Sequence, residues 1–263
     1  MTERPTGRPT GRPTGRRRVL ILGGTGEAVA LAEALAGRAD VTYSLAGRTD
    51  APRLPPGVAV RSGGFGGAAA LAGWIEAGRI DAVIDATHPF ADIIAGNAEA
   101  ACRRAGTLRL KLLRPGWEAR TGDIWHAAGS VADAARLIPE TGGNVFLAVG
   151  RQQLAAFAGA AAGSGRQFLI RTVDLLTAAP FAGAVCVTGR GPFSVQEEAA
   201  LLREHAIGCV VSRNAGGPSS YAKIAAARSL SVPVIMIDRP PPPPGDCAAD
   251  VEGALDWLRQ RLG

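Results

Sequence analysis

A glycine-rich turn follows the first apolar run of the chain. Residues 17–22 have the pattern of a buried strand, and a segment with helical spacing begins soon after it. The turn between them consists of Gly23, Gly24, Thr25, Gly26 and Glu27. Glycine lets backbone approach a pyrophosphate closely, and a helix N-terminus offers free N–H groups. The full G-x-G-x-x-G spacing is absent and such turns also occur without ligands, but the position after the first strand favours a dinucleotide site.

The residues after the second predicted strand indicate which dinucleotide would bind. An NAD site places Asp or Glu there for the ribose 2′-hydroxyl, whereas this segment reads Ser44-Leu45-Ala46-Gly47-Arg48-Thr49. Arg48 can pair with a 2′-phosphate, which predicts NADPH as the cofactor. The nearby Asp50 leaves open that Arg48 is a solvated loop residue.

Two further strand ends carry residues that suit a cofactor or a substrate. Residues 62–67 contain four glycines, among them Gly64, and so permit close backbone approach or a mobile loop. The segment 85–91, Asp-Ala-Thr-His-Pro-Phe-Ala, places Thr87 and His88 at the edge where α/β proteins bind ligands. His88 is a candidate proton donor or carboxylate ligand, although it could equally cap the helix predicted to begin at residue 89.

Three predicted strands in the second half end in arginine beside glycine or asparagine. The residues are Arg151, Arg190 and Arg213, the last followed by Asn214 and Gly216, with Lys223 on the next helix. The carboxyl ends of parallel strands lie along one edge, so these guanidinium groups would face an anionic ligand there. The alternative is a set of surface salt bridges, and Lys223 could be solvated.

Alternating strands and helices position these residues. The first half has predicted strands at 17–22, 41–45, 58–61, 82–85 and 108–112 and helices to about residue 36 and at 68–77 and 89–105. The second half has strands at 145–149, 168–171, 185–188, 209–212 and 234–237 and helices at 152–161, 194–205, 221–230 and 251–262. This alternation predicts α/β architecture with parallel, doubly wound sheets. For the helix at 194–205, Ser194 is a candidate N-cap and Glu197 occupies the capping-box position.

The domain organisation follows from breaks in this alternation. Residues 1–16 repeat Pro-Thr-Gly-Arg and are expected to be a disordered tail. A boundary near residues 139–143 divides a cofactor-binding domain, 17–140, from a second domain, 141–263, that binds substrate. The cleft between them is the expected binding site. Residues 239–245 include five consecutive prolines and must form an extended connector.

Composition excludes several other classes of protein. No apolar run approaches the ~18 residues of a membrane span, and no signal peptide is evident, so we expect no membrane partner and a cytoplasmic location. The net charge of +6 comes mainly from scattered arginines, without the basic helix face of a nucleic-acid binder. The four cysteines and three histidines lack metal-site spacing, so we expect no metal and free thiols in a reduced compartment.

Taken together, these motifs resemble those of the precorrin-6A reductase family. The matching segments are 23–27, 44–48, 63–67, 85–91, 189–193, 214–217, 221–224 and 234–240, which span nearly all of residues 18–240. The order of Asp-Ala-Thr-His-Pro-Phe-Ala and Gly-Arg-Gly-Pro-Phe is the most specific element. Members of this family often carry Lys at the position of Arg213 and Ser at that of Ala215, so the contact of Arg213 with substrate would differ in reach and geometry.

The resemblance implies two Rossmann-like domains with NADPH bound at the cleft between them. It also implies an oxidoreductase that reduces one double bond of precorrin-6A, a polycarboxylate tetrapyrrole, to give precorrin-6B in cobalamin biosynthesis. The proton that accompanies the hydride could come from His88, Lys223 or water, or the macrocycle could absorb the charge. Two alternatives are the cobalt-containing substrate of the anaerobic branch and a non-catalytic NADP-sensing module. Transient contact with neighbouring pathway enzymes is a further expectation.

Overall fold

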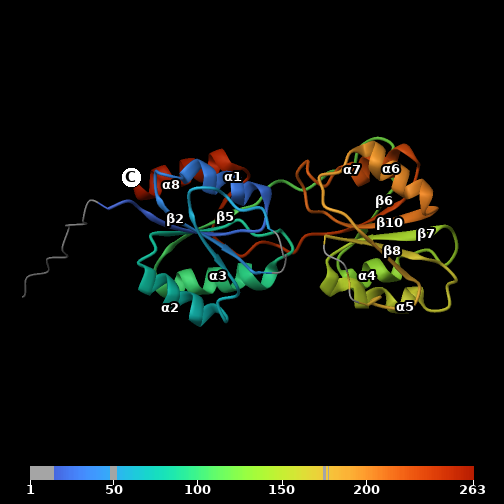
Figure 1. The fold of residues 1–263 in the computed structure, drawn as a ribbon, viewed down its shortest axis with the longest axis horizontal. Coiled ribbons are helices and arrows are strands. Elements are labelled where there is room, and N and C mark those ends of the chain that lie inside the picture. The colour runs from blue at the N-terminus through green and yellow to red at the C-terminus, as the bar shows by residue number, and fades with distance from the viewer. Residues whose placement is uncertain (1–14, 48–51, 174–175, 177) are drawn as a thin grey trace, which may run out of the picture.

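The computed structural model describes residues 15–47, 52–173, 176 and 178–263. Nearly all of the predicted tail, as well as Arg48, lies outside these residues. Within the described residues the chain forms two α/β units, each with a six-stranded parallel sheet between helices (Figure 1). The predicted fold class is therefore confirmed. No helix formed by the described residues is long and apolar enough to cross a membrane.

The first sheet has the strand order β12-β5-β4-β1-β2-β3. Its helices lie on both faces, with α1 and α8 packed together on one and α2 and α3 on the other (Figure 1). The elements are β1 (Arg18–Leu22), α1 (Gly26–Leu35), β2 (Asp40–Leu45), β3 (Ala59–Ser62), α2 (Ala68–Gly78), β4 (Ala82–Asp85), α3 (Asp92–Ala105), β5 (Leu108–Leu112), β12 (Asp246–Ala248) and α8 (Val251–Leu262).

The second sheet has the order β6-β11-β10-β7-β8-β9. Helices α6 and α7 pack together on one face, and α4, η1 and α5 group on the other (Figure 1). The elements are β6 (Trp125–Ala128), α4 (Val131–Arg136), β7 (Asn144–Ala148), η1 (Arg151–Phe157), α5 (Ala158–Ala161), β8 (Phe168–Thr172), β9 (Ala184–Thr188), α6 (Val195–Glu204), β10 (Ile207–Arg213), α7 (Ala222–Ser229) and β11 (Val234–Ile237).

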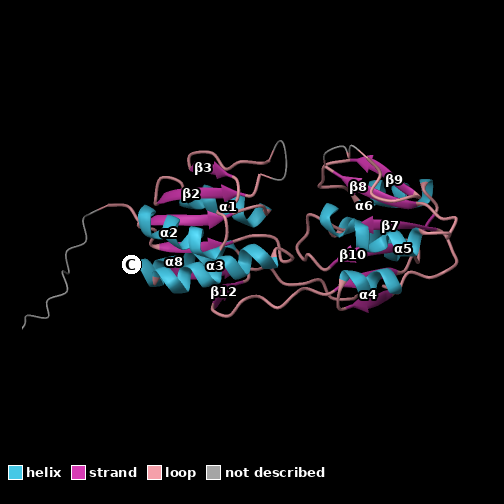
Figure 2. Cartoon of the chain, turned by 90° about the horizontal axis from the view of Figure 1, so that it is seen from below, coloured by secondary structure: helices cyan, strands magenta, loops and turns pink. Residues whose placement is uncertain are grey.

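The predicted division into domains 17–140 and 141–263 is wrong in two places. Strand β6 lies before residue 139, yet it pairs with β11 of the second sheet. Strand β12 lies near the end of the chain, yet it pairs with β5 of the first sheet, and α8 packs on α1. The second domain is therefore inserted between β5 and β12 of the first. The two domains lie side by side and are joined by two connectors (Figure 2). The short β6 and β12 carry too little pattern to show this in the sequence.

Each sheet is buried because its central strands are apolar on both faces. In β1, Val19, Leu20, Ile21 and Leu22 are all buried, and they divide between two hydrophobic clusters on opposite faces of the sheet. The central strands of the second sheet divide in the same way. Because these strands are buried on both faces, they lie within the rigid core of each domain. The residues at their carboxyl ends are therefore held in place by that core. These ends are where the candidate residues lie.

The helices near the site begin where the sequence predicts in one case and differ from the prediction in two. Helix α6 begins as predicted, with the Ser194 hydroxyl accepting from Glu197 N and the Glu197 carboxylate accepting from Ser194 N. Helix α3 begins at Asp92 rather than at residue 89, because 89 and 90 form a turn. The helix predicted at 152–161 consists of a 3₁₀ segment and a single α-helical turn.

Candidate functional site

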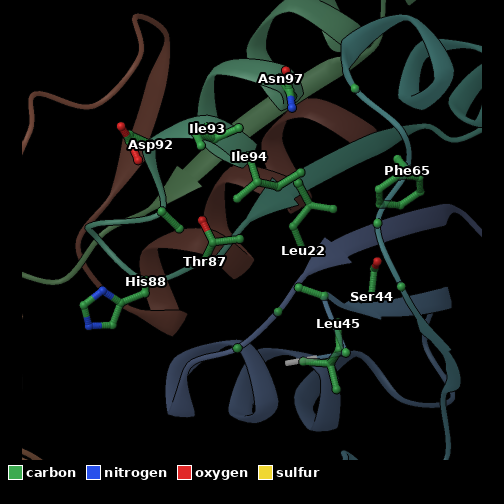
Figure 3. Close-up of a pocket in the computed structure, with 18 of the residues that line it drawn as sticks. Leu22, Ser44, Leu45, Phe65, Thr87, His88, Asp92, Ile93, Ile94 and Asn97 are labelled. Carbon is green, nitrogen blue, oxygen red and sulfur yellow. The ribbon is translucent and has the colours of Figure 1, made fainter. Parts of the chain in front are cut away.

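A cavity of about 470 Å³ lies over the carboxyl ends of β1, β2, β3 and β4. Ser44 and Phe65 lie toward one end of it and His88 toward the other, with Thr87 and Ile94 between them (Figure 3). Gln152 reaches it from the second domain. The remaining lining comes mainly from the segments 22–24, 45–47, 63–67 and 90–97. An elongated cavity on this edge of a parallel sheet is where α/β proteins hold nucleotides.

The glycines of this edge leave room above the backbone. A Cβ atom added at Gly24, Gly26, Gly63 or Gly64 would meet no atom within 4 Å. Gly24 has φ +117° and Gly63 has φ +107°, so both also need the conformational freedom of glycine. Gly23 differs, because its Cβ would lie 2.3 Å from the Tyr43 ring. The open glycines give a ligand access to backbone N–H groups, whereas the lack of a side chain at Gly23 makes room for the Tyr43 ring.

Two side chains fix the shape of the first turn. The buried Tyr43 hydroxyl accepts a hydrogen bond from Gly24 N at 3.2 Å, and burial raises the pKa of Tyr43, partly offset by that bond. The Thr25 hydroxyl donates to Ala86 O at 2.8 Å and accepts from Ala28 N at 3.1 Å, which caps α1. Thr25 therefore ties the turn to the end of β4, and any contact with a ligand must leave these bonds in place.

An arginine that the sequence analysis missed organises the far end of the cavity. Arg61, at the end of β3, donates to Ser44 Oγ at 2.8 Å and to Gly63 O at 2.9 Å. Its guanidinium carbon lies 3.8 Å from the centroid of the Phe65 ring. This places a positive charge beside Ser44. Its position at a strand end next to a glycine-rich loop was the available sequence signal.

Buried charges hold the end of β4. Asp85 is fully buried and accepts hydrogen bonds from Thr87 Oγ1 at 2.6 Å and from Lys111 Nζ at 3.0 Å. Lys111 Nζ also lies 3.2 Å from Thr87 Oγ1. The Thr87 hydroxyl thus donates to Asp85 and accepts from Lys111. Thr87 lines the cavity, but its hydroxyl proton is already donated to Asp85.

His88 lies at the opposite end of the cavity from Ser44, in a strongly cationic environment. Its Nδ1 accepts a hydrogen bond from Phe90 N at 3.2 Å, so Nε2 carries the proton of the neutral ring. Burial and then the nearby charges of Arg213, Arg114, Arg239 and Lys111 lower the pKa of His88 to about 3. His88 is therefore neutral at physiological pH and presents an N–H donor in a region that attracts anions.

The predicted substrate residues at the end of β10 divide into two groups. Arg213 reaches toward the first domain, with its guanidinium carbon 5.3 Å from the centroid of the Phe90 ring. Its Nε is buried without a hydrogen-bond partner among the described residues. Asn214 instead binds the connector: its Oδ1 accepts from Trp117 N at 2.7 Å and its Nδ2 donates to Trp117 O at 2.9 Å. A Cβ at Gly216 would lie 2.1 Å from Pro115 O, so this glycine allows close chain packing.

The other two predicted arginines lie apart from one another. Arg151 opens η1 directly after β7, and β7 is the neighbour of β10. A Cβ added at Gly150 would lie 3.5 Å from Arg213 Nη1, which places the end of β7 beside Arg213. Arg190 follows β9, the outermost strand, which is separated from β7 by β8. Arg151 and Arg190 are exposed, whereas Arg213 is half-buried.

Lys223 is buried on α7 rather than solvated. Only 8% of it is exposed, its Nζ donates to Ser220 O at 2.6 Å, and it lies 5.4 Å from the centroid of the Trp117 ring. Burial lowers the pKa of Lys223 to about 8, with Glu198 opposing this shift and Arg171 and Arg213 adding to it. Lys223 lines neither the first cavity nor a larger one beside Trp117 and Tyr221.

Glu27 does not line the cavity that Gly23 and Gly24 line. Its carboxylate pairs with Arg114 of the connector after β5, with 2.7 Å between Oε2 and Nη1. Both residues line a second cavity of about 1000 Å³, together with Trp117, Tyr221 and Glu252 among others. This arrangement therefore gives no support to the expectation that Glu27 contacts the cofactor.

Other chemistries find little support among the described residues. No cluster of three His, Cys, Asp or Glu side chains could hold a metal ion there. All four cysteines are free, and burial raises the pKa of Cys102 to about 12 and that of Cys209 to about 11, which suppresses thiolate formation.

Comparisons with known proteins agree with this architecture. Residues 18–259 match the family model described as precorrin-6x reductase CbiJ/CobK. The chain is 49% identical to precorrin-6A reductase of Rhodococcus erythropolis, over 92% of this chain and 97% of that protein. It is 43% identical to precorrin-6A reductase of Rhodobacter capsulatus, over 92% and 95% of the two chains.

A more distant relative and a solved structure complete the comparison. The cobalt-precorrin-6A reductase of Salmonella typhimurium is 30% identical over 85% of this chain and 88% of that protein. The solved structure of CobK precorrin-6A reductase superposes with a TM-score of 0.87 at 42% identity, and it covers 93% of this chain and 97% of that chain. The chain belongs to the precorrin-6x reductase CbiJ/CobK family.

Proposed function

We propose that this chain is an NADPH-dependent precorrin-6A reductase of cobalamin biosynthesis. In this reaction one double bond of the macrocycle gains a hydride and a proton, giving precorrin-6B. Bound NADPH supplies the hydride, and the protein supplies binding, orientation and electrostatics. The observation that carries the proposal is the elongated cavity along the carboxyl edge of the first sheet, with glycines that leave room for a ligand.

The residues present fit a dinucleotide laid along this edge. The turn containing Gly24 and Gly26 precedes α1 and offers backbone N–H groups to a pyrophosphate. The adenosine end would then lie toward Ser44, and at that end the described residues that line the cavity include no acidic side chain, while Arg61 supplies positive charge. That pattern supports NADPH over NADH, and the sequence offers Arg48, which lies outside the described residues, as a second cation. The nicotinamide end would lie toward His88.

The tetrapyrrole would occupy the space between the two sheet edges. Its acetate and propionate groups need cationic and N–H donors, and Arg213 and His88 supply both from opposite domains. Arg151 and Arg190 extend this basic surface toward the outer strand. A protein that only sensed NADP would have no use for such a surface.

A candidate for the proton is Lys223, whose Nζ donates to Ser220 O and which lines neither of the two cavities. His88 is neutral at physiological pH, so in the free protein it can donate a hydrogen bond but carries no acidic proton. Lys223 has a pKa of about 8 and is therefore mostly protonated at pH 7. If Lys223 delivers the proton, kcat falls as the pH rises through about 8 in the wild type.

The test is direct measurement of turnover. Purified protein is mixed with NADPH and precorrin-6A, and the decrease in nicotinamide absorbance is followed together with the macrocycle spectrum. We expect equimolar consumption of both and a lower KM for NADPH than for NADH. Oxidation of NADPH without a change in the macrocycle, or none at all, would refute the assignment.

The sequence identities to the relatives favour a metal-free substrate over a cobalt-containing one. The relatives named precorrin-6A reductase are 43–49% identical to this chain, whereas the cobalt-precorrin-6A reductase of Salmonella typhimurium is 30% identical. Metal-free precorrin-6A is therefore the first candidate. Parallel assays with the two substrates distinguish them, since the preferred one has the higher kcat/KM.

A further inference from the structure

One arginine joins the two halves of the proposed site. Arg114 lies in the connector after β5, and its Nη1 pairs with Glu27 Oε2 in the first turn of α1 at 2.7 Å. Its Nε donates to Ala215 O at 2.8 Å and to Gly216 O at 2.9 Å in the loop after β10. A single guanidinium therefore bridges a helix of the first domain and a loop of the second.

The loop after β10 is shaped around this side chain. Gly216 and Gly217 have φ angles of +65° and +71°, a conformation that favours glycine. A Cβ at Gly217 would lie 2.7 Å from Arg114 Cδ. Arg239, from the returning connector, donates to Arg114 O at 2.7 Å and to Asn214 O at 2.7 Å, which fixes the backbone on which Arg114 is mounted. Arg114 therefore lies in a closely packed contact between the connector after β5 and the loop after β10.

Both ends of the bridge are next to ligand-binding groups. Glu27 follows Gly26, which begins α1, and Ala215 is two residues after Arg213. The ion pair is partly desolvated, with 13% of the Arg114 side chain and 27% of the Glu27 side chain exposed. Because Glu27 neutralises Arg114, the pair adds no net charge at the start of α1. Its effect is to fix the position of the first turn of α1 relative to the loop after β10.

We propose that Arg114 is a positioning residue that couples cofactor binding in the first domain to substrate binding at the end of β10. The proposal rests on the proposed function, which places the pyrophosphate at α1 and the tetrapyrrole at Arg213. Both ligands prefer the bridged state, since each uses groups that Arg114 holds in register. Coupling of this kind is reciprocal, so the substrate should tighten cofactor binding by the factor with which the cofactor tightens substrate binding.

Hydrogen exchange measures this coupling without the reaction. In the wild type, NADP⁺ should slow amide exchange at residues 23–27, where it binds, and also at residues 215–217 across the joint. In Arg114→Met the protection at 23–27 should remain and that at 215–217 should disappear. Protection at 215–217 that persists in the variant, or that is missing in the wild type, overturns the coupling.

Two further variants separate the bridge from general loosening. Glu27→Gln leaves Arg114 in place but removes its ionic partner, so it should weaken the protection at 215–217, and it serves in place of Arg114→Met if that protein does not fold. Arg228→Met removes a comparable ion pair, with Asp123, that lies at the second domain alone. NADP⁺-dependent protection should survive in this control. Its loss there would show that the effect is not specific to Arg114 and would overturn the proposal.

Substrate titration then tests the reciprocal effect. Precorrin-6A should bind the wild type about fivefold or more tightly with NADP⁺ present, and the variant Arg114→Met should reduce that factor to about one. An unchanged factor overturns the coupling. Failure of the proposed function gives a different result: a wild type that shows no protection at 23–27 lacks the cofactor site, and one that binds NADP⁺ but no tetrapyrrole lacks the substrate assignment. The first result also overturns the coupling, whereas after the second the exchange experiment still decides whether Arg114 links the domains.

Discussion

The glycines after β1 and β3 and those after β10 look alike in the sequence but serve different purposes. A Cβ atom would meet no atom within 4 Å at Gly24, Gly63 or Gly64, which line the cavity, or at Gly26, which begins α1. At Gly216 and Gly217 a Cβ would lie 2.1 Å from Pro115 O and 2.7 Å from Arg114 Cδ. The first group gives room to a ligand, and the second gives room to another part of the chain. A paired glycine at a strand end therefore signals close approach but does not say of what.

The largest effect on ligand binding is expected at the open glycines. Gly26→Val places a branched side chain where the pyrophosphate should approach, so NADPH binding should weaken by about 100-fold or more, equivalent to ~2.7 kcal/mol. The added side chain meets no protein atom at its Cβ, so the melting temperature should change little. Calorimetric titration and thermal melting measure the two effects. Normal NADPH binding by the variant would place the phosphates elsewhere.

The packed glycines should show the reverse behaviour. Gly216→Ala forces an L-residue to a φ of +65° and drives its Cβ into Pro115 O and Arg239. The cost should be about 2–4 kcal/mol of the free energy of unfolding, seen as a decrease in melting temperature of about 5 °C or more. Gly26→Ala is the matched control and should melt like the wild type. A variant Gly216→Ala of unchanged stability would contradict the contrast between the two groups.

Arginines at the second sheet edge sharpen the comparison from the ligand side. Arg213→Met should weaken precorrin-6A binding by about 10- to 100-fold, because a charge-assisted contact contributes about 1.5–3 kcal/mol, while NADPH binding stays within about twofold. Arg190→Met, at the outermost strand, should have the smaller effect. Titrations with each ligand measure both. A loss confined to NADPH in Arg213→Met would reverse the division of labour between the domains.

The smallest effect concerns the cationic region around His88. Its pKa is about 3 in the folded protein and 6.5 ordinarily, so between these pH values the unfolded chain binds a proton that the folded one does not. Stability should therefore fall as the pH decreases through this window. His88→Gln should remove about 1 kcal/mol of that loss at pH 5, allowing for partial solvent exposure. Urea unfolding at pH 7 and pH 5 tests this, and equal pH dependence in both proteins would show that His88 is not held neutral.

Sequence patterns gave most of the fold because most strands carry their own signal. Strands β4, β5 and β11 were predicted to the residue, since apolar residues dominate β4 and β11 and alternate with Arg109 and Lys111 in β5. Strands β6 and β12 were missed because four and three residues of mixed character form strands only when a neighbour pairs with them. Their pairing decides which domain they join, so the domain boundary was missed with them.

The candidate site was predictable only where local chain geometry determines it. The glycines and His88 stand at strand ends that the pattern locates, and the cavity lies there. The bonds of Arg114 to Glu27 and of Asn214 to Trp117 join residues 87 and 97 positions apart, and no local spacing announces them. Arg48 lies outside the described residues, so its role remains a proposal from the sequence.

Insertion of one domain within the other also sets the order in which the protein can be completed. A ribosome delivers β6 through β11 before it delivers β12 and α8, so the second sheet can close while β5 still has a bare edge. During that interval Leu110 and Leu112 lack the cover of Leu258, with which they share a cluster in the finished protein. The nascent first domain therefore exposes an unpaired strand edge, which is the feature that chaperones and aggregation both act upon.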